Sequence, residues 1–399
     1  MSRPHTPRLL ALVALATLAA CAQLAPPVPL GAEDHQARIA ADRAAIVRDV
    51  EPVGARLGLD EAIARALKYN LDRRARMLEQ ALALQQYDAS GHDMLPRLVA
   101  AAGYSARDSD RLSRSVDATT GQPLGVDPSV SQERRHTLTQ LDLTWNLLDY
   151  GLARYNAQQT GDRVLAAAER RRKATHLLVQ DVRTAYFRAA SAQRLRGEVA
   201  AALTLADEAM ADARKSEQEK LRSPLDSLRY QRQLTENMRL LESIEQELAT
   251  ARIDLAALIN APVVQQVTLA MDEEPLPLDL LDTPAADMEM QALSQNADLR
   301  EQRHLRRIAQ AEAHKVIHRA YPNVTFTLGA NHDTDSYLVN PTWAEVGAQF
   351  SFNLFNLLSL PAQKRTAEAA IALADQRRLA AHVAVVAQVH VAREQLGHA

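Results

Sequence analysis

The fold is decided by a stretch that occurs twice, "ALKYNLDRR" at residues 66–74 and "ALSQNADLR" at residues 292–300. The same offset, without a gap, aligns Pro96 with Pro322. Matches of Asn and Pro in one register are more informative than matches of Ala or Leu, because this chain is rich in both of the latter. The distance between the copies far exceeds the period of solenoid repeats, so the pattern indicates a duplicated half-domain.

Each copy has the same order of expected elements. A helical stretch comes first, at residues 59–94 and again at 286–320, and ends at a Leu-Pro or Tyr-Pro pair because the residue before proline avoids the α region. Two segments that alternate between apolar and polar residues follow, as in "LDLTWNLLD" at 141–149, "VTFTLGAN" at 324–331 and "AQFSFNLFN" at 348–356. This period of two predicts strands with one apolar face.

The apolar face of these strands has two interpretations. It could be the buried side of an ordinary soluble hairpin. With four such strands in a chain that carries an export signal, we favour an apolar side that faces lipid and a polar side that faces a lumen. The residues expected to face lipid are Leu141, Leu143, Trp145, Leu147, Phe326, Leu328, Phe350, Phe352 and Leu354.

A long helical hairpin is expected after the second strand of the first copy. Apolar residues from Leu178 to Ala213 recur in alternating steps of four and three, with one interruption at Arg196. This spacing indicates a heptad seam. We expect one helix over residues 152–221 and a return helix over about 224–258. Ser223 can cap the start of the return helix, and Pro224 fits its first turn. The seams alone would also fit a free coiled-coil rod.

The N-terminal segment reads as an export signal. A positively charged start precedes a short apolar core at residues 9–18 and then small residues. The only cysteine of the chain, Cys21, follows in "LAAC", which resembles the lipobox of bacterial lipoproteins. That likeness implies a signal peptide at residues 1–20 and a lipid-anchored segment at 21–56. The alternative is ordinary cleavage after Ala22, which would discard the cysteine.

Composition and motifs argue against other classes of function. The chain has 24% charged residues, a formal net charge of −3 and no basic block of the kind that binds nucleic acid. No catalytic motif is present, so we expect no enzyme activity and no cofactor. His314 and His318 are four residues apart and could face one metal ion. Two histidines lack a third ligand, however, so we expect no metal site.

The duplicated order of helix, strand, strand and long hairpin resembles the TolC-like outer-membrane efflux family, in its lipoprotein form. The segments that carry the resemblance are "LDEAIARALKYNLDRRARMLEQALA", "MLPRL", "LDLTWNLLDYG", "SPLDSLRYQRQL" and "SFNLFN". It implies a mainly α protein with a small β part. Long antiparallel helical hairpins would form a periplasmic α-barrel, and four strands per protomer would contribute to a trimeric transmembrane β-barrel.

The resemblance also implies partners and a location. The protein would be a homotrimer in the outer membrane of a Gram-negative bacterium, in contact with its lipid and extending into the periplasm. It would dock onto a periplasmic adaptor (a membrane fusion protein) and an inner-membrane pump, as a passive duct of an efflux or type I secretion system. The expected adaptor contacts at the hairpin tip are Lys220, Ser223, Pro224 and Asp226.

The expected boundaries place the first repeat at residues 57–262, a linker at 263–285 and the second repeat at 286–399. Two features depart from the family pattern. Lys220 stands where relatives usually carry glycine, and the second repeat has no counterpart of the return helix. The chain therefore reads as C-terminally truncated. The alternatives are a lipid-anchored periplasmic coiled-coil protein, structural or adaptor-like and without a pore, or a non-functional relative of the channel.

Overall fold

The computed structural model describes residues 31–113, 116–122, 129–219, 223–262, 267–270 and 278–398. The chain divides into two compact units, Met1–Val53 and Gly54–Ala399. In the first unit, the described residues form one helix, α2 (Ala32–Val47), with no buried residue. The second unit carries both repeats, and everything that follows concerns this unit.

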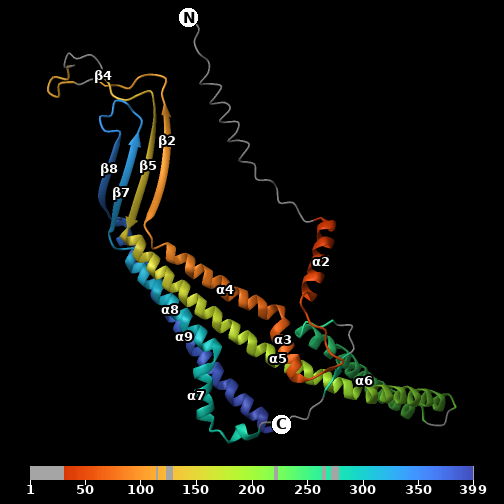
Figure 1. Cartoon of the computed structure of the whole chain (residues 1–399). Coiled ribbons are helices and arrows are strands. Elements are labelled where there is room, and N and C mark those ends of the chain that lie inside the picture. The colour runs from red at the N-terminus through yellow and green to blue at the C-terminus, as the bar shows by residue number, and fades with distance from the viewer. Residues whose placement is uncertain are drawn as a thin grey trace. The chain divides into compact units, whose positions relative to one another are not determined.

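The two repeats contain the same succession of elements (Figure 1). The first contains α3 (Leu59–Tyr69), α4 (Leu71–His92), β2 (Arg97–Ala106), β5 (Arg135–Asn146) and α5 (Leu147–Gln218), followed by the return helix α6 (Pro224–Leu258). The second contains α7 (Ala285–Gln295), α8 (Ala297–His318), β7 (Asn323–Asp333), β8 (Thr342–Ser351) and α9 (Leu354–His398). Short elements complete the unit: β1 (Arg56–Leu57), β3 (Leu112–Ser113), β4 (Ser129–Val130), β6 (Thr268–Leu269) and the 3₁₀ helix η1 (Leu278–Asp282).

The first helix of each repeat was expected to be continuous, and this expectation is wrong at one residue in each copy. Asn70 leaves the helical conformation between α3 and α4, and its side chain accepts a hydrogen bond of 2.9 Å from the backbone N–H of Arg73. Asn296 does the same between α7 and α8, with a bond of 3.0 Å from the N–H of Leu299. An asparagine at this position satisfies a free N–H of the following helix, so the duplicated Asn marks a helix start.

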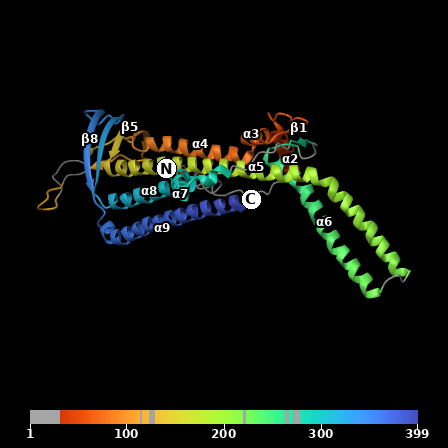
Figure 2. The same cartoon turned by 90° about the horizontal axis from the view of Figure 1, so that it is seen from below.

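The strands form one antiparallel sheet in the order β2-β5-β7-β8. The long helices follow the same order, because α4 contacts α5, α5 contacts α8, and α8 contacts α9 (Figure 2). Each helix is next to one strand in the chain, with at most four residues between them, and α5 follows β5 without a break. The layer of helices and the sheet are therefore two ends of the same four chain segments, with α4–β2 at one edge and β8–α9 at the other.

The helical hairpin of the first repeat confirms the expected heptad seam. Of the α5 seam residues, Val182 and Ala189 are fully buried, and Met210 near the tip is 8% exposed. The return helix α6 packs against α5, burying Ala251 and Leu255. Arg196, which interrupts the pattern, lies exposed on α5.

A small buried cluster holds the base of this hairpin. Strands β1 and β6 pair in parallel, and the Tyr186 hydroxyl of α5 donates hydrogen bonds to the carbonyls of Leu57 and Ala270 on either side of the pair. The Gln193 side chain donates to the Leu269 carbonyl at 3.2 Å and accepts from the Leu269 N–H at 3.0 Å. One helix thus satisfies the backbone of two strands that are distant in sequence.

The two asparagine caps can be tested by substitution. We expect Asn296→Ala to lower the free energy of unfolding by about 1 kcal/mol, because the N–H of Leu299 loses its acceptor. Asn296→Asp keeps an acceptor oxygen and is the matched control, which should stay within a few tenths of a kcal/mol of the parent. Unfolding followed by circular dichroism of the purified protein measures both. Equal stability of Asn296→Ala and the parent would show that the cap does not set the helix start.

Candidate functional site

The four-stranded sheet exposes its apolar face. The pairing register brings Leu98, Leu143, Leu328 and Val346 side by side across the four strands. Phe326 is flanked by Trp145 and Ala348 in the same way. Leu328 is 49% exposed and Val346 83% exposed. A row of large apolar side chains therefore faces outward.

The opposite face of the sheet is polar; on that face of β7, Gly329, Asn331 and Asp333 are buried, whereas Thr327 is exposed. Asn331 is 3% exposed and Asp333 7% exposed, and the Gln140 side chain donates a 3.1 Å hydrogen bond to Asn331 Oδ1. In a soluble sheet that covers a core, the apolar face would be buried and the polar face solvated. In this sheet the apolar face is exposed and part of the polar face on β7 is buried, which is the pattern expected of strands with an apolar exterior and a polar interior.

Gly329 leaves room for two acidic side chains on the polar face. A Cβ atom at this position would lie 3.0 Å from Asp142 Oδ1 and 3.1 Å from Glu345 Cγ. These residues flank Gly329 on β5 and β8 in the pairing register. The glycine therefore allows carboxylates from both neighbouring strands to lie against the central strand.

Six of the nine apolar residues expected to face lipid lie in strands on one face: Leu141, Leu143, Trp145, Phe326, Leu328 and Phe350. The strand assignment is wrong for the other three. Leu147 is the first residue of α5 and Leu354 the first residue of α9, while Phe352 lies between β8 and α9.

Asparagine side chains explain why the strands end early. Asn146 Oδ1 accepts a 2.9 Å hydrogen bond from the N–H of Asp149 at the start of α5. Asn353 Oδ1 accepts a 3.1 Å bond from the N–H of Phe355 at the start of α9. The alternating pattern continues past these residues, but the capping hydrogen bonds begin a helix there. The helix α9 therefore begins at Leu354 and contains Pro361 in its interior.

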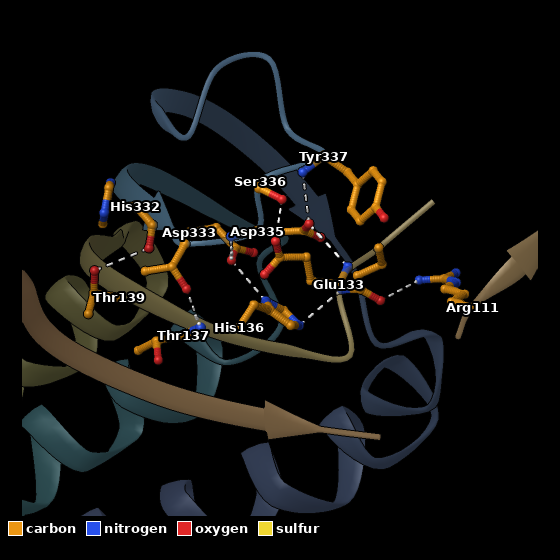
Figure 3. A network of polar contacts seen from close by, with 12 residues as sticks. Arg111, Glu133, His136, Thr137, Thr139, His332, Asp333, Asp335, Ser336 and Tyr337 are labelled. Carbon is orange, nitrogen blue, oxygen red and sulfur yellow. Dashed lines mark hydrogen bonds and ion pairs between the residues drawn. The ribbon is translucent and has the colours of Figure 1, made fainter. Parts of the chain in front are cut away.

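A polar network ties the two repeats together at the far end of the sheet (Figure 3). His136 Nδ1 at the start of β5 lies 2.8 Å from Asp333 Oδ1 at the end of β7. Asp335 Oδ1 accepts hydrogen bonds of 3.1 Å from the N–H groups of Glu133 and Tyr337. Two segments, residues 133–136 before and at the start of β5 and residues 333–337 after β7, therefore share these two nearly buried carboxylates.

Sequence reasoning missed this network. A signal was available in "DTDS" at residues 333–336, because aspartates directly after a strand commonly accept hydrogen bonds from nearby backbone N–H groups. Nothing in the local pattern identifies His136 as the partner, since it lies far away in the sequence.

Polar side chains also join α5 to α8 in the helical layer. Gln159, which is 2% exposed, donates to the Ile308 carbonyl at 3.2 Å and to Glu312 Oε2 at 2.9 Å. Lys315 Nζ lies 3.1 Å from the Glu312 carboxylate. Partial burial raises the pKa of Glu312, but the hydrogen bonds from Gln159 and Lys315 outweigh it and lower the pKa below its ordinary value.

The hairpin tip is described only in part. Ser223 occupies the N-cap position of α6, Pro224 is its first residue, and Asp226 lies exposed in the first turn with Oδ1 3.8 Å from Arg229 Nη1. Lys220, and also the lipidation candidate Cys21, lie outside the described residues.

The two histidines weighed as metal ligands lie among aromatic rings. His314 stacks on Tyr155 with ring centroids 5.6 Å apart, and His318 meets Tyr155 and Tyr321 edge to face. The His318 ring lies so close to Gly151 of α5 that a Cβ atom there would overlap it. Within the described ranges, no three His, Cys, Asp or Glu side chains are grouped in a way that could hold a metal ion.

None of the helices in the described part of the chain combines the length and apolar character that a membrane-spanning helix needs.

Comparison with known proteins identifies the class. The model of the family described as outer membrane efflux protein matches residues 62–261, which cover α4, the strands β2 and β5, and the α5–α6 hairpin. This chain belongs to the outer membrane efflux protein family. No curated protein matches it.

Solved structures share the fold. CusC is 20% identical with a TM-score of 0.55, and the match covers 84% of this chain and 75% of CusC. The outer membrane protein VceC from Vibrio cholerae is 15% identical with a TM-score of 0.57, covering 82% and 75%. The CmeC outer membrane channel of Campylobacter jejuni is 13% identical with a TM-score of 0.59, covering 84% and 71%.

The lowered pKa of Glu312 predicts a pH dependence of stability. A carboxyl whose pKa is depressed in the folded state stabilises that state above its ordinary pKa of 4.5, and this contribution is lost as the pH falls through the lowered value. We expect Glu312→Gln to be less stable than the parent at neutral pH. The difference should shrink on acidification below about pH 4.5.

Melting temperatures of both proteins between pH 7 and pH 3 measure this effect. Glu368→Gln on α9 is a suitable control, since its carboxylate lies exposed and 3.8 Å from Lys364, and it should leave the pH profile unchanged. A parent and a Glu312→Gln variant with parallel pH profiles would contradict the assignment.

Proposed function

We propose that this protein is the outer-membrane channel of a multi-part efflux or type I secretion system. It would act as a passive export duct across the outer membrane and periplasm and would perform no chemical reaction. The observation that carries this proposal is the inverted sheet, with Leu328 and Val346 exposed on one face and Asn331 buried on the other. An apolar exterior matches lipid, and a polar interior matches a water-filled passage.

The edges of the protomer support assembly into a homotrimer. Within the described chain, β2 and β8 each pair on one side only, and an unpaired edge strand is a template for another chain. The adjoining edge helices expose large apolar side chains, Leu78 and Leu82 on α4 and Leu373 and Val383 on α9. If α4 of one copy packs against α9 of the next, the strand edges meet as well. Three copies of four strands would then close one transmembrane β-barrel, as the family resemblance implies.

The α5–α6 hairpin supports docking onto a periplasmic adaptor and an inner-membrane pump. It extends from the helical layer at the end away from the sheet (Figures 1 and 2). Leu225 and Leu228, beside the candidate contacts Ser223, Pro224 and Asp226, are 57% and 56% exposed. Exposed leucines at a hairpin tip are suited to a protein partner. We propose that this tip, with Lys220, is the adaptor contact, and that a lipid on Cys21 adds an anchor in the outer membrane.

The function can be tested by complementation. We expect the chain, expressed in a Gram-negative strain that lacks its own outer-membrane efflux channel, to lower the accumulation of a fluorescent pump substrate when a cognate adaptor and pump are co-expressed. Omitting the pump gives the control for passive leakage. Unchanged accumulation in the complete system, with the protein present in the outer membrane, would contradict a role in export.

The two faces of β7 should differ in their tolerance of charge. Leu328→Lys places a lysine on the apolar face near mid-strand, at a cost of about 2–4 kcal/mol if that face meets lipid. Thr327→Lys places the same side chain on the polar face, where it stays hydrated. We expect the first variant to assemble poorly into membranes and the second to assemble almost normally, as measured by the fraction of protein in the outer membrane. Similar assembly of both would argue against a lipid-facing sheet.

Cys21 should be the site of lipid attachment. We expect labelled palmitate to be incorporated into the parent protein and not into Cys21→Ser, which should accumulate as unprocessed precursor or leave the membrane fraction more readily. Ala22→Ser, next to the cysteine, is the matched control and should be labelled normally. Palmitate labelling of Cys21→Ser would place the lipid elsewhere.

A further inference from the structure

An aromatic pair lies where the apolar face of the sheet meets the helices. Trp145 is on the apolar face of β5 beside Phe326, and Tyr150 near the start of α5 meets it edge to face, with ring centroids 5.9 Å apart. Trp145 is 40% exposed and Tyr150 39% exposed. Trp and Tyr are enriched at the headgroup level of a bilayer. This inference rests on the proposed function, in which the apolar face meets lipid and the aromatic pair lies at the periplasmic boundary.

Arg154 follows Tyr150 by one turn on the same side of α5, because residues four apart are neighbours on a helix surface. The rise of 1.5 Å per residue places its Cα about 6 Å further from the sheet along the helix axis. The headgroup layer on each side of a bilayer is about 5–7 Å thick, so Arg154 lies at its depth. Since α5 continues directly from β5 (Figure 1), the Cα–Cβ bond of Arg154, which is tilted toward the helix N-terminus, points back toward the aromatic pair.

Arg154 is an uncompensated positive charge on this surface. Its side chain is exposed, and no group among the described residues accepts a hydrogen bond from it or forms an ion pair with it. Arg307, which lines the same surface hollow, is instead neutralised by Asp162, with Nε 3.2 Å from Oδ1. A guanidinium binds phosphate oxygens through two parallel hydrogen bonds. An anionic phospholipid is the best match, since a zwitterionic headgroup brings a positive charge of its own.

This surface stays open when copies of the chain assemble through their edges. Strand β5 lies between β2 and β7, and α5 contacts α4 and α8. The proposed trimer contacts involve only the edges formed by α4–β2 and β8–α9. Assembly therefore leaves the aromatic pair and Arg154 accessible to the surrounding lipid.

We propose that Arg154, together with Tyr150 and Trp145, forms a binding site for the phosphate of an anionic phospholipid in the periplasmic leaflet of the outer membrane. The guanidinium binds the phosphate, and the two rings contact the part of the lipid where the headgroup meets the acyl chains. This contact ties the junction of β5 and α5 to the headgroup layer.

Trp145 itself can report which lipid lies beside it. The chain has two tryptophans, so Trp343→Phe leaves Trp145 as the only one. The full chain with this substitution is placed in vesicles of phosphatidylcholine and phosphatidylglycerol in equal parts. One of the two lipids at a time carries bromine on its acyl chains, which quenches tryptophan fluorescence on contact. We expect brominated phosphatidylglycerol to quench more strongly, corresponding to an affinity of the site about fivefold higher than for phosphatidylcholine.

Two arginines of α5 provide matched variants. Arg154→Gln should remove the preference for phosphatidylglycerol and leave the quenching by brominated phosphatidylcholine unchanged. Arg163→Gln removes the same charge nine residues later, which is two and a half turns and therefore the opposite side of the helix. Arg163 is also exposed and has no ionic partner in the described part of the chain, and its variant should keep the preference. Circular dichroism confirms folding, and the difference between the parent and Trp145→Phe reports the same residue if Trp343→Phe does not fold.

Several outcomes would overturn the site and leave the proposed channel function intact. Equal quenching by the two brominated lipids would show that the site does not select an anionic headgroup. A preference that survives Arg154→Gln would place the contact elsewhere, and an equal loss in Arg163→Gln would show that net charge attracts the lipid. Absence of quenching by either lipid would instead contradict the lipid-facing sheet on which this inference rests.

Discussion

The antiparallel pairing of β5 with β7 is the contact on which the two repeats depend. It joins residues 138–146 of the first repeat to 325–333 of the second with unbroken register. Because β5 runs directly into α5 and α8 leads into β7, this register also fixes the positions of α5 and α8 relative to each other along their axes. The hydrogen bonds of Gln159 on α5 to Ile308 and Glu312 on α8 lie in the helical layer that the same pairing aligns. So does the ion pair between Asp162 of α5, which is 2% exposed, and Arg307 of α8. The network around His136 and Asp333 closes the outer end of that pair.

Much of this architecture could be predicted from the sequence, because the spacing of apolar residues differs between strands and packed helices. Strands with a period of two and helices with a heptad seam can be recognised from the spacing of their apolar residues, so β7 and the α5–α6 hairpin were expected close to where they occur. The duplicated Asn70 and Asn296 were correctly recognised as equivalent, but their role as helix caps was not. Alternation alone also could not reveal that Asn146 and Asn353 end their strands, because a capping side chain competes with a pattern that continues beyond it.

The candidate site was predictable to a lesser degree. Residues that share a strand face could be grouped, and six of the nine apolar residues lie as grouped. Contacts between distant segments could not be found, since neither His136 nor Asp162 differs from a surface residue in its local sequence. The burial of Asp162 follows only once α4 and α8 are placed on either side of α5. Inverted burial is likewise a property of the folded sheet, visible as an exposed Val346 and a buried Asn331.

The direct junction of strand and helix has a consequence for how such a chain can evolve. Deleting one residue in β5 would turn every following side chain of that strand to the other face. One residue lost at the start of α5 would rotate the rest of that helix by about 100° about its axis, since a turn takes 3.6 residues. Insertions and deletions are therefore excluded from the paired segments and are left to the connections between strands of a repeat. That is where the copies differ in length, with residues 107–134 joining β2 to β5 and only 334–341 joining β7 to β8.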